Sequence, residues 1–123
     1  MNRIKVSTNF SLHEFQCTGS GASHNHVVLD SKLLAALQQL RTAIGRPIII
    51  NSGYRCPQRN SAVGGSPTSR HMQGRAVDIR VTGMTPRQVA AAAEKIPAFR
   101  GIGTYSTFTH LDTRPEAPAR WNG

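Results

Sequence analysis

His71 and Asp78 lie seven residues apart, with Gly74 between them and a strand-like run, residues 75–81, at the end of the stretch. A helix would hold the two side chains about 10 Å apart along one face, whereas two ligands of one zinc ion both lie about 2 Å from it. A turn at Gly74 removes this conflict, because it lets a loop histidine face a strand aspartate. From spacing alone, a metal site and a turn histidine beside an arginine-paired aspartate are equally good interpretations.

Residues 75–81 alternate in polarity with the period of a strand. One face is apolar, and the other carries Ala76, Asp78 and Arg80. Three more strands are predicted, at residues 47–51, 101–105 and 107–113. On the last of them Phe108, His110 and Asp112 share a face. His110 is the remaining histidine with strand signals around it, so it is the candidate for a third metal ligand on a neighbouring strand.

Three helix starts can be located from their capping residues. Ser11 and Glu14 form a capping-box pattern before a short helix. Asp30 caps a longer helix whose leucines recur at helical spacing and which ends at Gly45. Thr85, followed by Pro86, begins a third helix that runs through the alanines to about residue 95.

These elements predict one α+β domain covering residues 1–123. We expect a small antiparallel sheet that carries the site and packs against two or three helices. The two prolines beyond Arg114 predict an irregular tail.

The formal net charge of +9 indicates a polyanionic partner such as nucleic acid, a membrane surface or an anionic cell wall. The basic residues are scattered between Arg3 and Arg120 instead of forming one basic tail. Only seven aromatic residues are present, and none is interleaved with arginine to form a stacking platform. We therefore do not expect nucleic-acid binding.

The first ten residues contain no apolar run of the length of a signal peptide. No stretch approaches the roughly 20 apolar residues of a membrane span. We expect cytoplasmic synthesis without a signal peptide and no stable membrane insertion. Cys17 and Cys56 are expected to be free thiols, and His24 and His26 are expected to be solvated loop residues instead of a second metal site.

Three blocks of residues carry a family resemblance. They are Ser-Gly-Tyr-Arg at 52–55, Ser-x-His-x-x-Gly-x-Ala-x-Asp at 69–78 and Gly-Ile-Gly-x-Tyr-x-x-Phe-x-His-x-Asp at 101–112. In this order and spacing they resemble the zinc D-alanyl-D-alanine carboxypeptidase family, which includes phage endolysins and vancomycin-resistance dipeptidases. The stretch from Phe10 to Cys17 also resembles the small phage and bacterial members.

The resemblance implies that His71, Asp78 and His110 bind one Zn²⁺ ion. It also implies that Arg55 contacts the substrate near the scissile bond and that Ser69 helps to bind the substrate. The implied reaction is metal-assisted amide hydrolysis, in which Arg55 would stabilise the developing oxyanion.

The general base is the point at which this sequence departs from the family. Many members carry a glutamate three residues before the last zinc histidine, or a histidine two before it, and this chain has Thr107 and Phe108 there. Asp112 is the nearest carboxylate. It fits two roles equally well, as the catalytic base or as the partner that orients a zinc-binding histidine.

The predicted function is that of a monomeric zinc peptidase acting on peptidoglycan stem peptides that contain D-alanine, as a carboxypeptidase or an endopeptidase. The sequence is compatible with a phage lysin that is released with a holin or carried in a virion. The alternative is a non-catalytic wall-binding or virion structural module that retains the fold.

Overall fold

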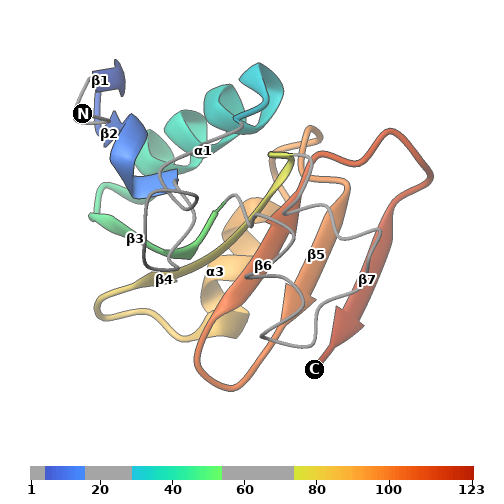
Figure 1. Ribbon diagram of the computed structural model, residues 1–123. Coiled ribbons are helices and arrows are strands. Elements are labelled where there is room, and N and C mark those ends of the chain that lie inside the picture. The colour runs from blue at the N-terminus through green and yellow to red at the C-terminus, as the bar shows by residue number, and fades with distance from the viewer. Residues whose placement is uncertain (1–4, 16–28, 54–73) are drawn as a thin grey trace, which may run out of the picture.

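The computed structural model describes residues 5–15, 29–53 and 74–123 (Figure 1). The predicted site residues Arg55, Ser69 and His71 lie outside these ranges, as do Cys17 and Cys56. The elements are β1 (Lys5–Ser7), β2 (Phe10–Ser11), the 3-10 helix η1 (Leu12–Phe15), α1 (Ser31–Ile44), β3 (Ile48–Ser52), β4 (Ala76–Val81), α3 (Pro86–Ala93), β5 (Gly101–Thr104), β6 (Thr109–Asp112) and β7 (Ala119–Asn122).

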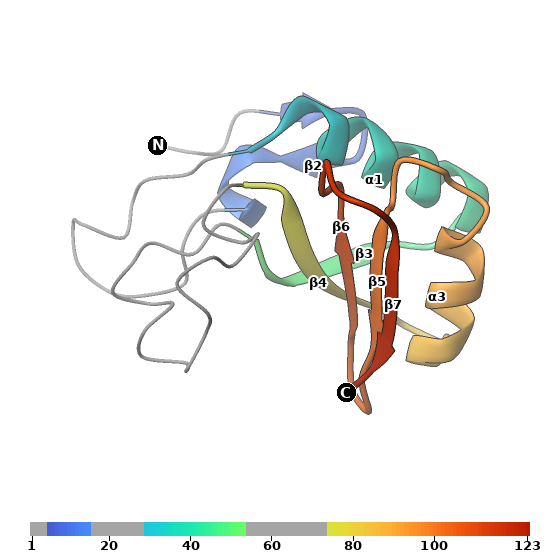
Figure 2. The same cartoon turned by 90° about the vertical axis from the view of Figure 1, so that its right-hand side faces the viewer.

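The main sheet has five strands in the order β3-β4-β6-β5-β7. The first three pairings are antiparallel, whereas β5 and β7 run parallel. Strands β1 and β2 form a separate antiparallel pair. Figure 2 shows the main sheet with α3 on one side and α1 above it. The α+β class is confirmed, and the sheet is mixed because of its last strand.

Both α1 and α3 begin where their capping residues predict, and α1 also ends where predicted. The Asp30 side chain accepts hydrogen bonds from the first backbone amides of α1, and Gly45 ends this helix with φ 71°. That left-handed conformation suits glycine, which has no Cβ to clash. Thr85 and Gln88 form both hydrogen bonds of a capping box at the start of α3. This helix ends at Ala93, two residues earlier than the alanine pattern indicates.

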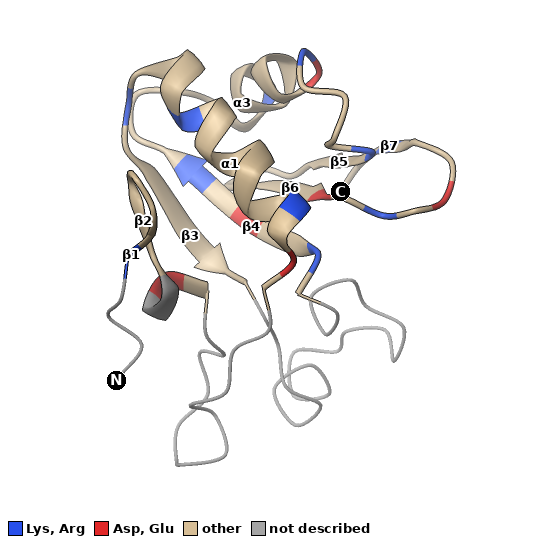
Figure 3. Cartoon of the chain, turned by 90° about the horizontal axis from the view of Figure 1, so that it is seen from above, with Lys and Arg blue, Asp and Glu red and all other residues tan. Residues whose placement is uncertain are grey.

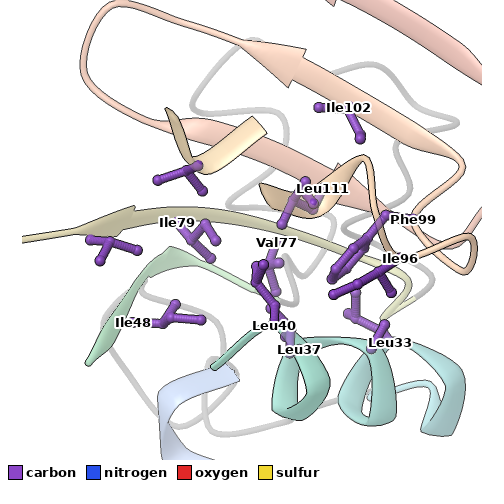
Figure 4. Close-up of a cluster of buried hydrophobic side chains, with 14 of the residues drawn as sticks. Leu33, Leu37, Leu40, Ile48, Val77, Ile79, Ile96, Phe99, Ile102 and Leu111 are labelled. Carbon is purple, nitrogen blue, oxygen red and sulfur yellow. The ribbon is translucent and has the colours of Figure 1, made fainter. Parts of the chain in front are cut away.

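The core lies between α1, α3 and one face of the main sheet. Alternation along β4 directs Val77, Ile79 and Val81 into this core, and each is buried. Figure 4 shows the leucines of α1 packed toward these strand residues and toward Phe99. Since the helices cover this face, functional polar side chains of β4 and β6 lie on the opposite face.

The amino-terminal elements pack onto the same core through two aromatic rings. Phe10 and Phe15 are buried with their ring centroids 5.8 Å apart. The Ser11 backbone N–H donates to Glu14 Oε2 at 2.6 Å. This is one of the two hydrogen bonds of the predicted capping box, the one that the glutamate side chain accepts. Gly53 lies against this turn, because a Cβ there would be 2.8 Å from the Phe15 carbonyl oxygen.

The prediction of an irregular tail after Arg114 is wrong. Residues Ala119–Asn122 form β7, which pairs in parallel with β5. Two prolines precede the strand but none lies within it, so its backbone amides stay available for the ladder. Within the described ranges, neither helix is long and apolar enough to cross a membrane.

We predict that Leu37→Ala lowers the free energy of unfolding by about 2–5 kcal/mol, because it leaves a cavity in the core. Leu37 has no exposed surface, whereas Leu34 on the same helix is only partly buried. Leu34→Ala is therefore the matched control, with a smaller expected loss. Denaturant unfolding of both variants provides the measurement, and equal losses would contradict this description of the core.

Candidate functional site

The face of the main sheet opposite the helices, here called the site face, carries two parallel rows of residues. Within each row, neighbouring residues are paired across adjacent strands. One row consists of Ser52, Asp78, His110, Gly103 and Trp121, taken from β3, β4, β6, β5 and β7. The neighbouring row consists of Ala76, Asp112, Gly101 and Ala119. Polar groups occupy the centre of both rows, and small residues flank Asp112. The sheet register therefore brings together side chains that are far apart in sequence.

His110 contacts an aspartate with each of its ring nitrogens. Its Nδ1 lies 3.0 Å from Asp78 Oδ1, and its Nε2 lies 2.8 Å from Asp112 Oδ2. The side chains of His110 and Asp78 remain 13% and 17% exposed. Hence this pair can be reached from solvent, whereas Asp112 lies beneath it with no exposed surface.

Asp112 is held by an arginine as well as by His110. The Arg114 guanidinium donates from Nε to Oδ1 and from Nη2 to Oδ2, both at 2.8 Å. The Arg114 backbone N–H adds a third bond, to Oδ1 at 3.2 Å. This two-pronged arrangement is the strong form of an arginine–carboxylate contact. Both carboxylate oxygens of Asp112 are therefore satisfied.

The two glycines of β5 make room for this arrangement. A Cβ on Gly101 would overlap the Asp112 carboxylate, and a Cβ on Gly103 would overlap the Trp121 indole. The Gly-x-Gly pattern has a physical reason here, because both glycines lie on the site face between larger side chains. Any side chain at either position would displace a residue next to His110.

An aromatic group borders the row on its β7 side. The Trp121 ring lies 5.2 Å from the His110 ring and 5.3 Å from the Arg114 guanidinium carbon, measured to the indole centroid. Its Nε1–H donates to the Tyr105 hydroxyl at 2.9 Å, and Tyr105 stacks on Phe108 with centroids 4.5 Å apart. Trp121 thus packs against both His110 and the arginine that holds Asp112.

The charges of this cluster stabilise one another. Burial lowers the pKa of His110, but hydrogen bonds with Asp112 and Asp78 outweigh this effect and raise the pKa above its ordinary value. Burial raises the pKa of Asp112, but Arg114 and His110 reverse this and hold the pKa far below its ordinary value. His110 therefore stabilises the metal-free fold below its ordinary pKa, and this contribution fades as the pH rises through the raised value.

Of the predicted site residues, the structure brings together Asp78, His110 and Asp112. Arg55, Ser69 and His71 lie outside the described residues. Within those described, no three His, Cys, Asp or Glu side chains form a group that could hold a metal. Arg114 and Trp121 also belong to this site, although no sequence motif predicted them. A signal for Arg114 was its position two residues after Asp112, and Trp121 is the single tryptophan of the chain.

We predict that Asp112→Asn lowers the pKa of His110 in the metal-free protein. Asparagine carries no charge, so it stabilises the imidazolium less than aspartate does. An NMR pH titration of the His110 ring protons, in the presence of a chelator, measures this shift. Glu94→Gln is the control, because Glu94 pairs with Arg120 on the surface away from His110. An unchanged pKa in Asp112→Asn would show that the contact with Nε2 is energetically unimportant.

Comparison with known proteins identifies the family of the chain. The Peptidase M15 family pattern matches residues 8–112. Zinc D-Ala-D-Ala carboxypeptidase of Streptomyces albus G is 50% identical over 44 residues, which are 35% of this chain and 17% of that protein. Peptidoglycan L,D-endopeptidase MepK of Escherichia coli K12 is 31% identical over 96 residues, covering 71% of this chain and 52% of that protein. The chain thus spans about half or less of these relatives, and it belongs to the Peptidase M15 family.

Proposed function

We propose that the protein is a zinc-dependent peptidase that hydrolyses peptide bonds in D-alanine-containing peptidoglycan stem peptides. The observation that carries this proposal is the contact between Asp78 and His110 on the face of the sheet opposite the helices, at 3.0 Å and within reach of solvent. The names of the two relatives, a zinc D-Ala-D-Ala carboxypeptidase and a peptidoglycan L,D-endopeptidase, support the metal and the substrate class.

The donor atoms suit zinc. A histidine nitrogen and a carboxylate oxygen are both common zinc ligands, with bonds of about 2.0–2.2 Å. Two ligands of a tetrahedral zinc ion are then about 3.3 Å apart, close to the 3.0 Å between His110 Nδ1 and Asp78 Oδ1. His71 is the proposed third ligand on the basis of the sequence motif. Zinc bound there would supply Lewis acidity toward the substrate carbonyl and toward a water molecule.

We propose that Asp112 orients His110 and is not the general base. Its carboxylate is buried and accepts bonds from Arg114 and His110, which leaves no oxygen directed to a substrate. Its lowered pKa also makes it a poor proton acceptor. A carboxylate that accepts the Nε2–H of His110 fixes the tautomer in which Nδ1 is free for a metal.

Arg55 and Ser69 complete the proposal from the sequence motifs. Arg55 would donate hydrogen bonds to the carbonyl oxygen as negative charge develops on it, and Ser69 would help to hold the peptide. We also propose that the protein acts on the cell wall as a monomer. The net charge of +9 favours approach to an anionic envelope. Release with a holin, or transport in a virion, is the proposed route for a phage lysin.

Incubation of the purified protein with peptidoglycan, with and without a chelator, tests the proposed activity. We expect zinc-dependent release of peptide fragments, whose masses identify the bond that is cleaved. A protein that binds zinc and the wall but releases no fragment would instead be a non-catalytic wall-binding module.

We predict that His110→Ala abolishes both stoichiometric zinc binding and cleavage, because it removes a proposed ligand. His26→Ala is the matched control, since His26 is expected to be a solvated loop residue, and it should retain both properties. Zinc content is measured by elemental analysis of the dialysed protein. Full zinc occupancy in His110→Ala would show that β6 does not supply a zinc ligand.

A further inference from the structure

A polar hollow lies beside the site, at the ends of β4 and β6 and near the start of α1. Its volume is about 730 Å³, within the range of ligand pockets in proteins. We call it the basic hollow, because it is lined by four cationic residues, Lys32, Arg75, Arg100 and Arg114, and by a single carboxylate, Asp30. In Figure 3, Lys and Arg are blue, and blue segments lie at the start of α1 and at the neighbouring start of β4.

Backbone hydrogen bonds fix the rim of the basic hollow. The Asp30 N–H donates to the Gly74 carbonyl at 2.9 Å, which joins the start of α1 to the start of β4. The Thr113 N–H donates to the Arg75 carbonyl at 3.0 Å, which joins the end of β6 to the same point. The cationic side chains therefore project from backbone positions that are held together by the fold.

The charges in the basic hollow are unbalanced. Arg114 is neutralised by Asp112. Asp30 is engaged as the cap of α1, where it accepts from the amides of Lys32 and Leu33. Arg100 donates from Nε to the Glu116 backbone carbonyl at 2.8 Å, which positions it without neutralising it. The Glu116 carboxylate, which is not part of the lining, also interacts with Arg114. Among the described residues, Lys32, Arg75 and Arg100 make no ion pair, so the basic hollow keeps an excess of positive charge that an anion can balance.

Lys32 is unfavourably placed for the helix itself. It lies in the first turn of α1, where the partial positive charge of the helix dipole disfavours a cation, and this turn contains no acidic residue. The carboxylate of the N-cap residue Asp30 offsets part of this unfavourable effect, and an anionic ligand in the basic hollow would offset more of it.

We propose that the basic hollow binds phosphate groups of a phosphodiester-linked polymer of the cell wall. Guanidinium groups match phosphate oxygens in pairs, and the excess positive charge of the chain attracts a polymer with a charge on every repeat. Arg114 lines the hollow and binds Asp112, so a polymer held there lies next to His110 and its substrate. The proposal relies on the proposed function only for the choice of the cell wall.

The test uses the double variant Lys32→Gln/Arg75→Gln of the whole chain. Its matched control is Arg87→Gln/Lys95→Gln, which removes the same charge from two exposed residues outside the basic hollow. Binding is measured by co-sedimentation with cell walls that carry the phosphodiester polymer and with walls stripped of it by hydrofluoric acid. We expect Lys32→Gln/Arg75→Gln to bind polymer-bearing walls about tenfold more weakly and the control to bind almost as the wild type does.

Three results would overturn the proposal. An equal loss in the control would show that only total charge matters. An equal loss on stripped walls would show that the bound anion is not the phosphate of this polymer. Tighter binding to single-stranded DNA than to the isolated polymer at equal phosphate concentration would identify a nucleic-acid site instead.

Two further measurements separate this proposal from folding and from the proposed function. Thermal unfolding of Lys32→Gln alone should give a melting temperature equal to or above that of the wild type, because a cation leaves the first turn of α1. If the double variant does not fold, the single variant is used for the binding comparison. Hydrolysis of a soluble stem peptide by the wild type tests the peptidase activity separately, since no polymer is present.

Discussion

The buried carboxylate of Asp112 is the constraint on which the site depends. A side chain with no exposed surface keeps its charge only if the protein replaces the lost water with donors and opposite charge. Arg114 and His110 do this, and removal of one partner from such a buried pair costs about 3–5 kcal/mol. Three features of the chain follow from this requirement. The Arg114 side chain must fold back to reach the Asp112 carboxylate. Gly101 must lack a side chain, because a Cβ would overlap that carboxylate. The His110 ring must keep the orientation in which Nε2 contacts Asp112.

The fixed orientation of the His110 ring determines what its second ring nitrogen, Nδ1, can contact. With Nε2 directed to Asp112, Nδ1 points to Asp78 across the strand pair. The Trp121 ring packs against His110 and against Arg114, so it restrains both. A metal ligand that is already oriented loses little conformational entropy on binding. The aspartate beneath the site and the tryptophan beside it therefore both contribute to the proposed zinc affinity without contacting the metal.

The elements that depend on local signals were predictable from the sequence. Asp30 and Gly45 determine the ends of α1 because caps act within one helical turn, and alternation placed Asp78 on the polar face of β4 because side-chain direction has a period of two. The β7 strand was missed because it exists only through its pairing with β5, which a short polar segment does not reveal. Trp121 was missed for the same reason, since it lies on β7. Arg114 was missed for a different reason, because its side chain turns back onto Asp112, two residues earlier in the chain.

The glycines of β5 are a case in which the motif could be read from the sequence but its structural role could not. The sequence displays Gly101 and Gly103 as part of a motif, but their function depends on the strand order. Only when β5 lies between β6 and β7 does Gly101 face Asp112 and Gly103 face Trp121. The motif was therefore visible before its cause was.

Metal binding at this site is necessarily coupled to protons. Without metal, the raised pKa of His110 reflects an imidazolium that donates to two aspartates. If zinc takes Nδ1, as we propose, that proton must leave, because a ligating histidine is neutral. Acid therefore opposes metal binding, and the same two aspartates that preorganise the ring raise the pH range over which the proton competes with the metal. Asp78 would regain favourable interaction with the metal, whereas Asp112 would keep its hydrogen bond throughout. The buried Asp112 thus fixes the geometry of His110, and both aspartates affect how readily its proton is exchanged for a metal.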